Sequence, residues 1–158
     1  MSRVKGRMGR YRKIAFSIVA LTVFAIPAYA QETPVGAWKT IDDASGKPRA
    51  IIRITEANGT LSGKIEKLIS EPGDEQNPRC IPCTDARKDQ PIVGMTILTG
   101  LKREGIATVW SGGEILDPDT AKVYKCKATL TGGGRKLEMR GYIGVPILGR
   151  TQTWIREP

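Results

Sequence analysis

Short stretches of the chain alternate between apolar and polar residues, and turn-forming residues separate them. In Val123–Leu130, the side chains of Tyr124, Cys126, Ala128 and Leu130 fall on every second position. Successive side chains of a β-strand point to opposite faces, so this period predicts a strand with one buried face. The same reasoning predicts strands at Val35–Ile41, Arg49–Glu56, Leu61–Leu68, Ile92–Leu98, Ile106–Trp110, Glu114–Leu116, Val123–Leu130, Lys136–Tyr142 and Gly149–Arg156.

Tight turns join most of these strands. Asn58-Gly59 is a residue pair that two-residue hairpins prefer. Its position favours a strand for Leu61–Leu68, although Ile65 and Ile69 also fit one face of a helix. Eight or nine short strands connected in this way form an antiparallel meander. A meander with one apolar face buries it most simply by closing on itself, so the sequence predicts an all-β, up-and-down barrel of eight to nine strands.

The first and last predicted strands carry a distinctive set of residues. Gly36-Ala37-Trp38 stands at the start of the first strand, and Trp154-Ile155-Arg156 at the end of the last. These strands are neighbours in a closed barrel, where Arg156 can stack on the Trp38 ring and contribute about 0.5–2 kcal/mol. The arrangement resembles lipocalins, whose first strand opens with G-x-W and whose last carries a packing arginine. We therefore expect Gly36, Trp38, Trp154 and Arg156 to be structural.

Residues 1–30 have the pattern of an export signal. Six basic residues and no acidic one lie in the first 13 positions, an apolar stretch runs from Ile14 to Ile26, and Ala28-Tyr29-Ala30 offers cleavage before Gln31. The apolar stretch is shorter than the roughly 20 residues that span a bilayer. We expect 1–30 to be a cleaved signal peptide and 31–158 a single lipocalin-like β-barrel domain. The product would be periplasmic or secreted, and not an integral membrane protein.

Charge and composition disfavour several functions. Six of the 25 Lys and Arg residues precede residue 31, which leaves 19 against 16 Asp and Glu, without a basic run. We therefore expect no nucleic-acid partner. The chain has no histidine, which removes the usual general base and the commonest metal ligand. The acidic pairs Asp42-Asp43 and Asp117/Asp119 are typical of turns. The sequence predicts no enzyme, no cofactor and no metal site.

The longest predicted loop, Ser70–Gln90, contains Cys80 and Cys83 in a C-x-x-C, and Cys126 is the third cysteine. An exported chain can form one disulfide from them. Chain entropy favours a bond from the loop to Cys126, at about 4 kcal/mol against about 2 kcal/mol for Cys80–Cys83. Geometry favours the local bond, because Cys126 lies on the apolar face of its strand. We expect the Cys80–Cys83 bond, in a long exposed loop, with a bond to Cys126 as the open alternative.

The stretch RGYIGVPILGRTQTW, residues 140–154, combines arginine, aromatic and glycine residues most densely. We favour its interpretation as a barrel corner followed by the closing strand. In a second interpretation it is a rim where apolar residues guard a cavity mouth and an arginine meets an acidic headgroup. The ligand-binding candidates are then Arg140, Tyr142, Ile143, Val145, Ile147 and Arg150.

Nearly all of residues 31–158 resembles the bacterial exported family called domain of unknown function 2147. The stretches that carry the resemblance, in unchanged order and spacing, are GAWKTIDDASGKPRAIIRI, GTLSGKIEKL, CIPCTDARKDQPIVGMTILTGLK, WSGGEILDPDTAKVYKCKATL and RGYIGVPILGRTQTWIR. The resemblance implies a lipocalin-like barrel and no established reaction. Ala121 departs from it, because glycine is expected after the Asp117-Pro118 turn.

Three hypotheses for function follow. The first is a non-enzymatic exported barrel that holds a small apolar or amphipathic ligand, since small barrels either fill with side chains or admit one such ligand. The second is an envelope interaction protein with a filled barrel that acts through its long Cys-containing loop. The third is a thiol-disulfide oxidoreductase that uses Cys80 and Cys83, although a redox C-x-x-C usually begins a helix in a βαβ context. Neither the ligand nor the oligomeric state follows from the sequence.

Overall fold

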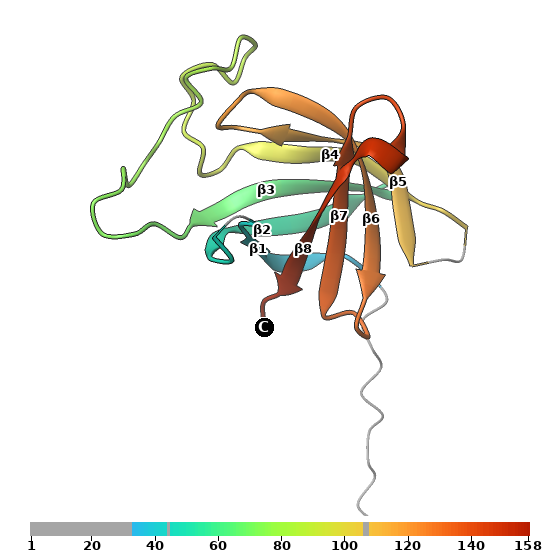
Figure 1. The fold of residues 1–158 in the computed structure, drawn as a ribbon. Coiled ribbons are helices and arrows are strands. Elements are labelled where there is room, and N and C mark those ends of the chain that lie inside the picture. Colours follow the sequence, from blue (N-terminus) through green and yellow to red (C-terminus); the bar gives the residue numbers. More distant parts are fainter. Residues whose placement is uncertain (1–32, 44, 106–107) are drawn as a thin grey trace, which may run out of the picture.

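The computed structural model describes residues 33–43, 45–105 and 108–158. The expected signal peptide, and residues 106–107 of one predicted strand, lie outside this part of the chain. The described residues form eight strands and one 3-10 turn (Figure 1). These are β1 (Gly36–Ile41), β2 (Pro48–Ala57), β3 (Thr60–Leu68), β4 (Thr96–Arg103), β5 (Val109–Asp117), β6 (Lys122–Thr131), β7 (Lys136–Tyr142), η1 (Pro146–Leu148) and β8 (Arg150–Arg156).

The strands form one closed antiparallel barrel. Each strand pairs with the next along the chain, and β8 pairs back with β1 through Trp38 opposite Arg156 and Thr40 opposite Trp154. This confirms the predicted all-β, up-and-down barrel. The connections β1–β2, β3–β4, β5–β6 and β7–β8 all lie at one end of such a barrel, which we call the mouth end. The opposite end, which we call the base, holds the start of β1 and the end of β8.

Local sequence explains the hairpin between β2 and β3. Ala57 lies opposite Thr60, so Asn58 and Gly59 alone form the turn. Their φ angles are +51° and +71°. Two consecutive positive φ angles give the turn whose twist matches that of paired strands, and asparagine and glycine tolerate them best. The predicted two-residue hairpin is confirmed.

The interior of the barrel is packed with large apolar side chains. The most deeply buried ones are Trp38, Trp154, Ile52, Ile54, Leu61, Leu98, Leu101 and Leu137. Cys126, Ala128 and Leu130 of β6 are buried on alternate positions, as the sequence pattern predicts. Burial of this apolar surface supplies most of the free energy that favours folding.

Outside β4 and β5 the strand boundaries differ from the predicted ones by no more than one residue, and β4 continues to Arg103 rather than ending at Leu98. β4 begins at Thr96 rather than Ile92, because residues 92–95 form a turn around Gly94, whose φ is +90°. Val109 and Trp110 of one predicted segment and the whole of the next, Glu114–Leu116, belong to one strand, β5. The register of β5 against β6 shifts between Trp110 and Gly113, so a bulge replaces the expected turn.

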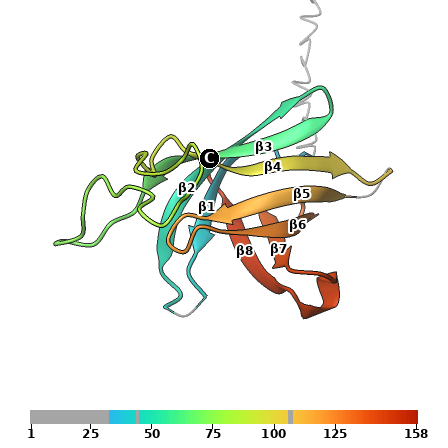
Figure 2. The same ribbon diagram turned by 90° about the horizontal axis from the view of Figure 1, so that it is seen from above.

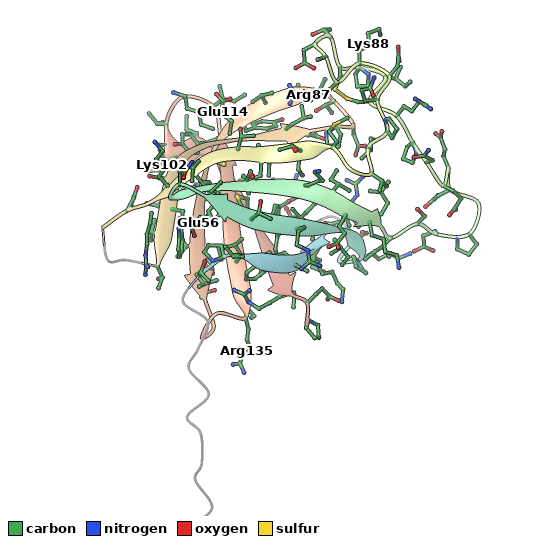
Figure 3. All side chains as sticks on the ribbon, turned by 180° about the vertical axis from the view of Figure 1, so that it is seen from behind. Glu56, Arg87, Lys88, Lys102, Glu114 and Arg135 are labelled. Carbon is green, nitrogen blue, oxygen red and sulfur yellow. A yellow bond between two sulfur atoms is a disulfide. The ribbon has the colours of Figure 1, made fainter. Side chains whose placement is uncertain are left out.

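The loop between β3 and β4 projects from the barrel but is fastened to it (Figure 2). At its two ends, Ile69 N–H donates to the Arg49 carbonyl of β2 and Gly94 N–H donates to the Ile65 carbonyl of β3, both at 2.8 Å. Within the loop, Cys80 N–H donates to the Gln90 carbonyl at 3.0 Å. Arg87 and Lys88 lie on the outer part of this loop (Figure 3). The predicted loop, Ser70–Gln90, is expected to be exposed, whereas both of its cysteines belong to the hydrophobic core.

Candidate functional site

The base of the barrel is closed by Arg156. Its guanidinium carbon lies 4.2 Å from the centre of the Trp38 ring. Three backbone carbonyls accept hydrogen bonds from this guanidinium, those of Thr33, Val35 and Gly134, at 2.6, 2.8 and 2.6 Å. Burial lowers the pKa of Arg156 from its usual value. The arrangement caps one end of the barrel.

Gly36 is part of the same closure. Its φ is +135°, and a Cβ atom at this position would lie 2.8 Å from Nη1 of Arg156. Any larger residue would therefore displace the guanidinium from the Trp38 ring. The predicted structural contacts of Gly36, Trp38 and Arg156 are all found at the base.

Trp154, the fourth of the predicted structural residues, differs from the others. Its side chain is 1% exposed inside the barrel, yet its Nε1 has no hydrogen-bond partner in the described structure. By contrast, Nε1 of Trp38 donates to the Pro34 carbonyl at 2.7 Å. A buried N–H without an acceptor costs roughly 1–3 kcal/mol, and such groups are rare in folded proteins. Among the described residues, Nε1 of Trp154 is the only buried side-chain nitrogen or oxygen atom without a hydrogen-bond partner.

Polar and partly exposed side chains face the interior near the mouth end. Gln152 lies opposite the buried Met139, which places it on the inner face of β8. Tyr124 shares the inner face of β6 with Cys126, and a Cβ atom at Gly141 would contact the Tyr124 side chain at 3.5 Å. Both Gln152 and Tyr124 are half-buried, so solvent reaches the inner wall from this end. The mouth end thus differs from the sealed base.

Cys80 and Cys83 form the disulfide, with their Cα atoms 5.4 Å apart. The predicted local pairing is confirmed, and Cys126 is free and buried. Cys80 is 0% and Cys83 2% exposed, and the Cys80 sulfur lies 3.4 Å from the Pro118 carbonyl oxygen of the β5–β6 turn. The disulfide therefore packs inside the loop against the barrel instead of being presented to a substrate thiol.

Cys126 has the properties of a core residue. Burial, and to a smaller extent the charge of Glu114, raise the pKa of its thiol to about 12. The thiol is therefore neutral at physiological pH, whereas a nucleophilic cysteine needs a lowered pKa and access to solvent.

The rim candidates come together in the connection between β7 and β8, but on the outer side of the barrel. Arg140 points outward and donates to the carbonyls of Pro146 and Ile147 at 2.6 and 3.0 Å, and to Oγ1 of Thr151 at 2.8 Å. Arg150 pairs with Asp43 of the β1–β2 turn at 2.8 Å. The two arginines therefore hold loops in place. Tyr142 is half-buried, and Ile143, Val145 and Ile147 are exposed to solvent.

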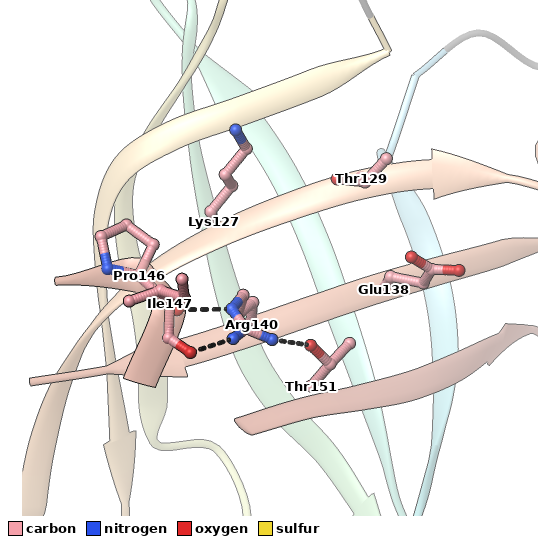
Figure 4. A pocket seen from close by; sticks show the side chains of 7 residues that line it. All are labelled: Lys127, Thr129, Glu138, Arg140, Pro146, Ile147 and Thr151. Atoms are coloured by element: carbon pink, nitrogen blue, oxygen red, sulfur yellow. Dashed lines mark hydrogen bonds between the residues drawn. The ribbon is translucent and has the colours of Figure 1, made fainter. Parts of the chain in front are cut away.

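A groove of about 300 Å³ lies beneath this connection (Figure 4). It opens on the outer face of β6, β7 and β8. Lys127, Thr129, Glu138, Arg140, Pro146, Ile147 and Thr151 line it. A second groove of about 380 Å³ lies beside the β3–β4 loop, between Arg87 and Thr96. Both grooves are outside the barrel.

Comparison with known proteins identifies the family. Residues 36–156 match the family described as "Uncharacterized protein conserved in bacteria (DUF2147)". The chain belongs to this family. The resemblance noted from the sequence is thereby confirmed over the whole barrel, from β1 to the end of β8.

A solved structure shows the same fold as this DUF2147 member. It is protein HP1028 from the human pathogen Helicobacter pylori, which is described as belonging to the lipocalin family. The two share 20% sequence identity with a TM-score of 0.65, over 78% of this chain and 82% of the other. At this identity the comparison establishes the lipocalin-like fold alone. None of the curated proteins compared with the chain matches it significantly.

Sequence reasoning about this DUF2147 chain missed the two polar residues of the inner wall. The alternation of β6 placed Tyr124 on the same face as Cys126, so this signal was present. Gln152 gave no such signal, because its neighbours in β8 do not alternate clearly. Within the described ranges, no cluster of His, Cys, Asp or Glu could hold a metal ion, and no helix has the length and apolar character to cross a membrane.

Proposed function

We propose that this protein is an exported, non-enzymatic binder of a small amphipathic ligand, held inside the barrel between Trp154 and the mouth end. The observation that carries the proposal is the buried Nε1–H of Trp154 without an acceptor. A ligand with a carbonyl, carboxylate or hydroxyl oxygen would supply the missing acceptor. Its apolar part would lie against the aliphatic inner wall, as in other barrels that hold one small ligand.

The chemistry of the inner wall supports an amphipathic ligand. Tyr124 and Gln152 are half-buried on this wall, and both side chains can donate and accept hydrogen bonds. Ile115 and Met139 provide apolar contact beside them. The residues predicted for export, 1–30, support the exported location. The absence of histidine and the burial of both disulfide sulfurs support a role without catalysis.

Native mass spectrometry of the protein purified from its own export compartment tests the proposal. We expect an adduct of small mass that dissociates on activation. Trp154→Phe retains a large apolar ring and removes the N–H, so adduct affinity should fall about three- to tenfold. Trp110→Phe is the matched control and should keep the adduct. No adduct on the unmodified protein, or equal adducts on both variants, would contradict the proposal.

A second candidate is the envelope interaction protein, favoured by the position of both grooves on the outside of the barrel. It requires a filled interior and a partner at the β3–β4 loop. A bare chain in the same spectra, together with a protein crosslinked through Lys88, would favour this candidate over the ligand binder.

A further inference from the structure

An ion pair crosses the mouth end of the barrel. Nη2 of Arg49, at the start of β2, lies 2.7 Å from Oδ2 of Asp119 in the β5–β6 turn. β3 and β4 separate β2 from the β5–β6 hairpin, so the two residues belong to nearly opposite walls (Figure 1). A contact between opposite walls has to pass over the opening. By contrast, the ion pair of Arg150 with Asp43 joins β8 to the turn after its neighbour, β1.

A bulge in β2 directs Arg49 over the opening. The next residue, Ala50, is buried inside the barrel, so regular alternation would turn Arg49 outward. The register against β1 shifts at this point, because Thr40 lies opposite Ala50 whereas Ile41 lies opposite Pro48. Arg49 is therefore the extra residue of a bulge, and bulges re-aim side chains. The ion pair with the opposite wall shows the direction that this side chain takes.

Carboxylates hold the Arg49 guanidinium in this position, but only weakly. The hydrogen bond to Asp119 raises the pKa of Arg49 above its usual value. The charges of Asp42 and Asp117 act in the same direction. Both side chains of the ion pair are more than half exposed. Exposed ion pairs are weak, so this one breaks and forms again readily.

The β5–β6 turn that carries Asp119 is held in place from two sides. Asp119 N–H and the Thr120 hydroxyl donate to the two oxygens of the Asp117 carboxylate, at 3.0 and 2.8 Å. From the outside, the Cys80 sulfur of the disulfide lies 3.4 Å from the Pro118 carbonyl oxygen. The arginine side chain is therefore the part of the contact that can move without a change in the backbone.

We propose that Arg49 is the gate of the barrel: paired with Asp119 it bars the mouth end, and its rotation away from Asp119 admits a small molecule to the inner wall. As a control of ligand entry, the gate rests on the proposed function. As a barrier in front of the inner wall, it can be tested without a ligand.

Cys126 reports whether the mouth end is open. It is the only free thiol of the chain, because the other two cysteines form the disulfide. Its side chain is buried and lies one inward position further from the mouth end than the half-buried Tyr124. Iodoacetamide, a small uncharged reagent, has to pass the mouth end to reach this thiol, because Arg156 caps the base. The protein is purified from its export compartment and kept without reductant at mildly alkaline pH, and its alkylation rate is followed by mass spectrometry.

Variants of the ion pair should open the gate. Arg49→Gln is too short to cross the opening and should raise the alkylation rate about two- to fivefold, as expected for the loss of one exposed ion pair. Asp119→Asn should change the rate in the same direction. The double variant should be no faster than Arg49→Gln, because both changes break the same contact. High salt should bring the unchanged protein towards the rate of the variants.

Arg53→Gln is the matched control. Arg53 lies on the same strand and forms an exposed ion pair with Glu66 at 2.9 Å, but on the outer face between β2 and β3. Its loss should leave the alkylation rate unchanged. Low concentrations of urea separate the gate from unfolding of the whole barrel. Rotation of one side chain exposes little surface, so the rate should not rise with urea, whereas global unfolding requires it to rise.

Two results would overturn the gate. The first is the same alkylation rate for Arg49→Gln, Arg53→Gln and the unchanged protein. The second is a rate that rises with urea as global unfolding does, since Cys126 would then react without passage through the mouth end. Neither result bears on the ligand, which the adduct in native mass spectra decides. A faster rate for Arg49→Gln without any adduct would support the gate and contradict the proposed function alone.

Discussion

Only three described residues other than glycine have φ in the left-handed region: Asn58, Asp89 and Ala121. Asparagine and aspartate tolerate this region because their short polar side chains bond locally, whereas alanine does not. Ala121 has a φ of +56° in the β5–β6 turn, at the position where the family resemblance led us to expect glycine. The departure noted in the sequence is thus a strained residue at a defined point of the fold.

Replacement of Ala121 by glycine should stabilise the protein. Relief of the left-handed strain favours the variant, while glycine's larger unfolded-state entropy and the lost methyl contact oppose it. We expect a net gain of up to about 1 kcal/mol, or roughly 3 °C in Tm. Thermal unfolding followed by circular dichroism measures this difference. Asn58→Gly is the control and should change Tm little, since asparagine already suits its turn.

At the scale of the elements, alternation and turn residues were sufficient to predict most strands. The clearest cases are β6 and β7, where one apolar face meets the core, and the hairpin at Asn58-Gly59. Alternation failed at residues 92–95, because the apolar Ile92 and Met95 pack from a loop rather than from a strand. It failed again at Gly112. A glycine there is typical of a turn between two strands, but in the structure a bulge lets β5 continue through it.

The candidate site was less predictable than the strands. The Nε1–H of Trp154 lacks a partner because of the residues that surround it in the folded barrel. Those residues are distant in the sequence, so no local sequence pattern predicts this. The rim stretch was placed correctly in a corner before the closing strand. Its side chains face outward because Arg140 bonds the carbonyls of Pro146 and Ile147, a contact that sequence spacing does not reveal.

The disulfide should stabilise the β3–β4 loop without being required for the barrel. In Cys80→Ser with Cys83→Ser, we expect the free energy of unfolding to fall by about 2 kcal/mol, the chain-entropy value for so short a loop. Urea unfolding monitored by fluorescence gives this difference. A reducing agent should lower the stability of the unchanged chain by a similar amount and leave the double variant unaffected. Amides of residues 79–92 should exchange faster in the variant, and equal exchange would contradict the fastening role of the bond.

At the scale of the whole molecule, two arginines of β8 differ greatly in their expected contribution to the stability of the fold. Arg156 at the base is half-buried, stacks on Trp38 and donates to three carbonyls. Arg150 at the mouth end is exposed and forms one ion pair with Asp43. Exposed ion pairs contribute about 0–1 kcal/mol, whereas several hydrogen bonds to a partly buried cation contribute more.

This difference gives a direct test of how the barrel is closed. Arg156→Lys retains the charge but cannot reach three carbonyls at once, so the free energy of unfolding should fall by about 2–4 kcal/mol. Arg150→Lys is the matched control on the same strand and should cost less than about 1 kcal/mol. Urea unfolding of the two variants side by side measures both values. Equal losses would show that the contacts at the base are not what closes the barrel.

The pairing of β1 with β8 also has a consequence for the order of events during synthesis. Every other strand pairs with one that directly precedes or follows it, but the two that seal the barrel are the first and the last to be made. β1 therefore has one unpaired edge, and Trp38 lacks its arginine, until the ribosome has completed β8. An open β edge on a nascent chain can pair with other chains. The period before closure is thus when this protein is most exposed to aggregation, and when a chaperone that covers β1 would have the greatest effect.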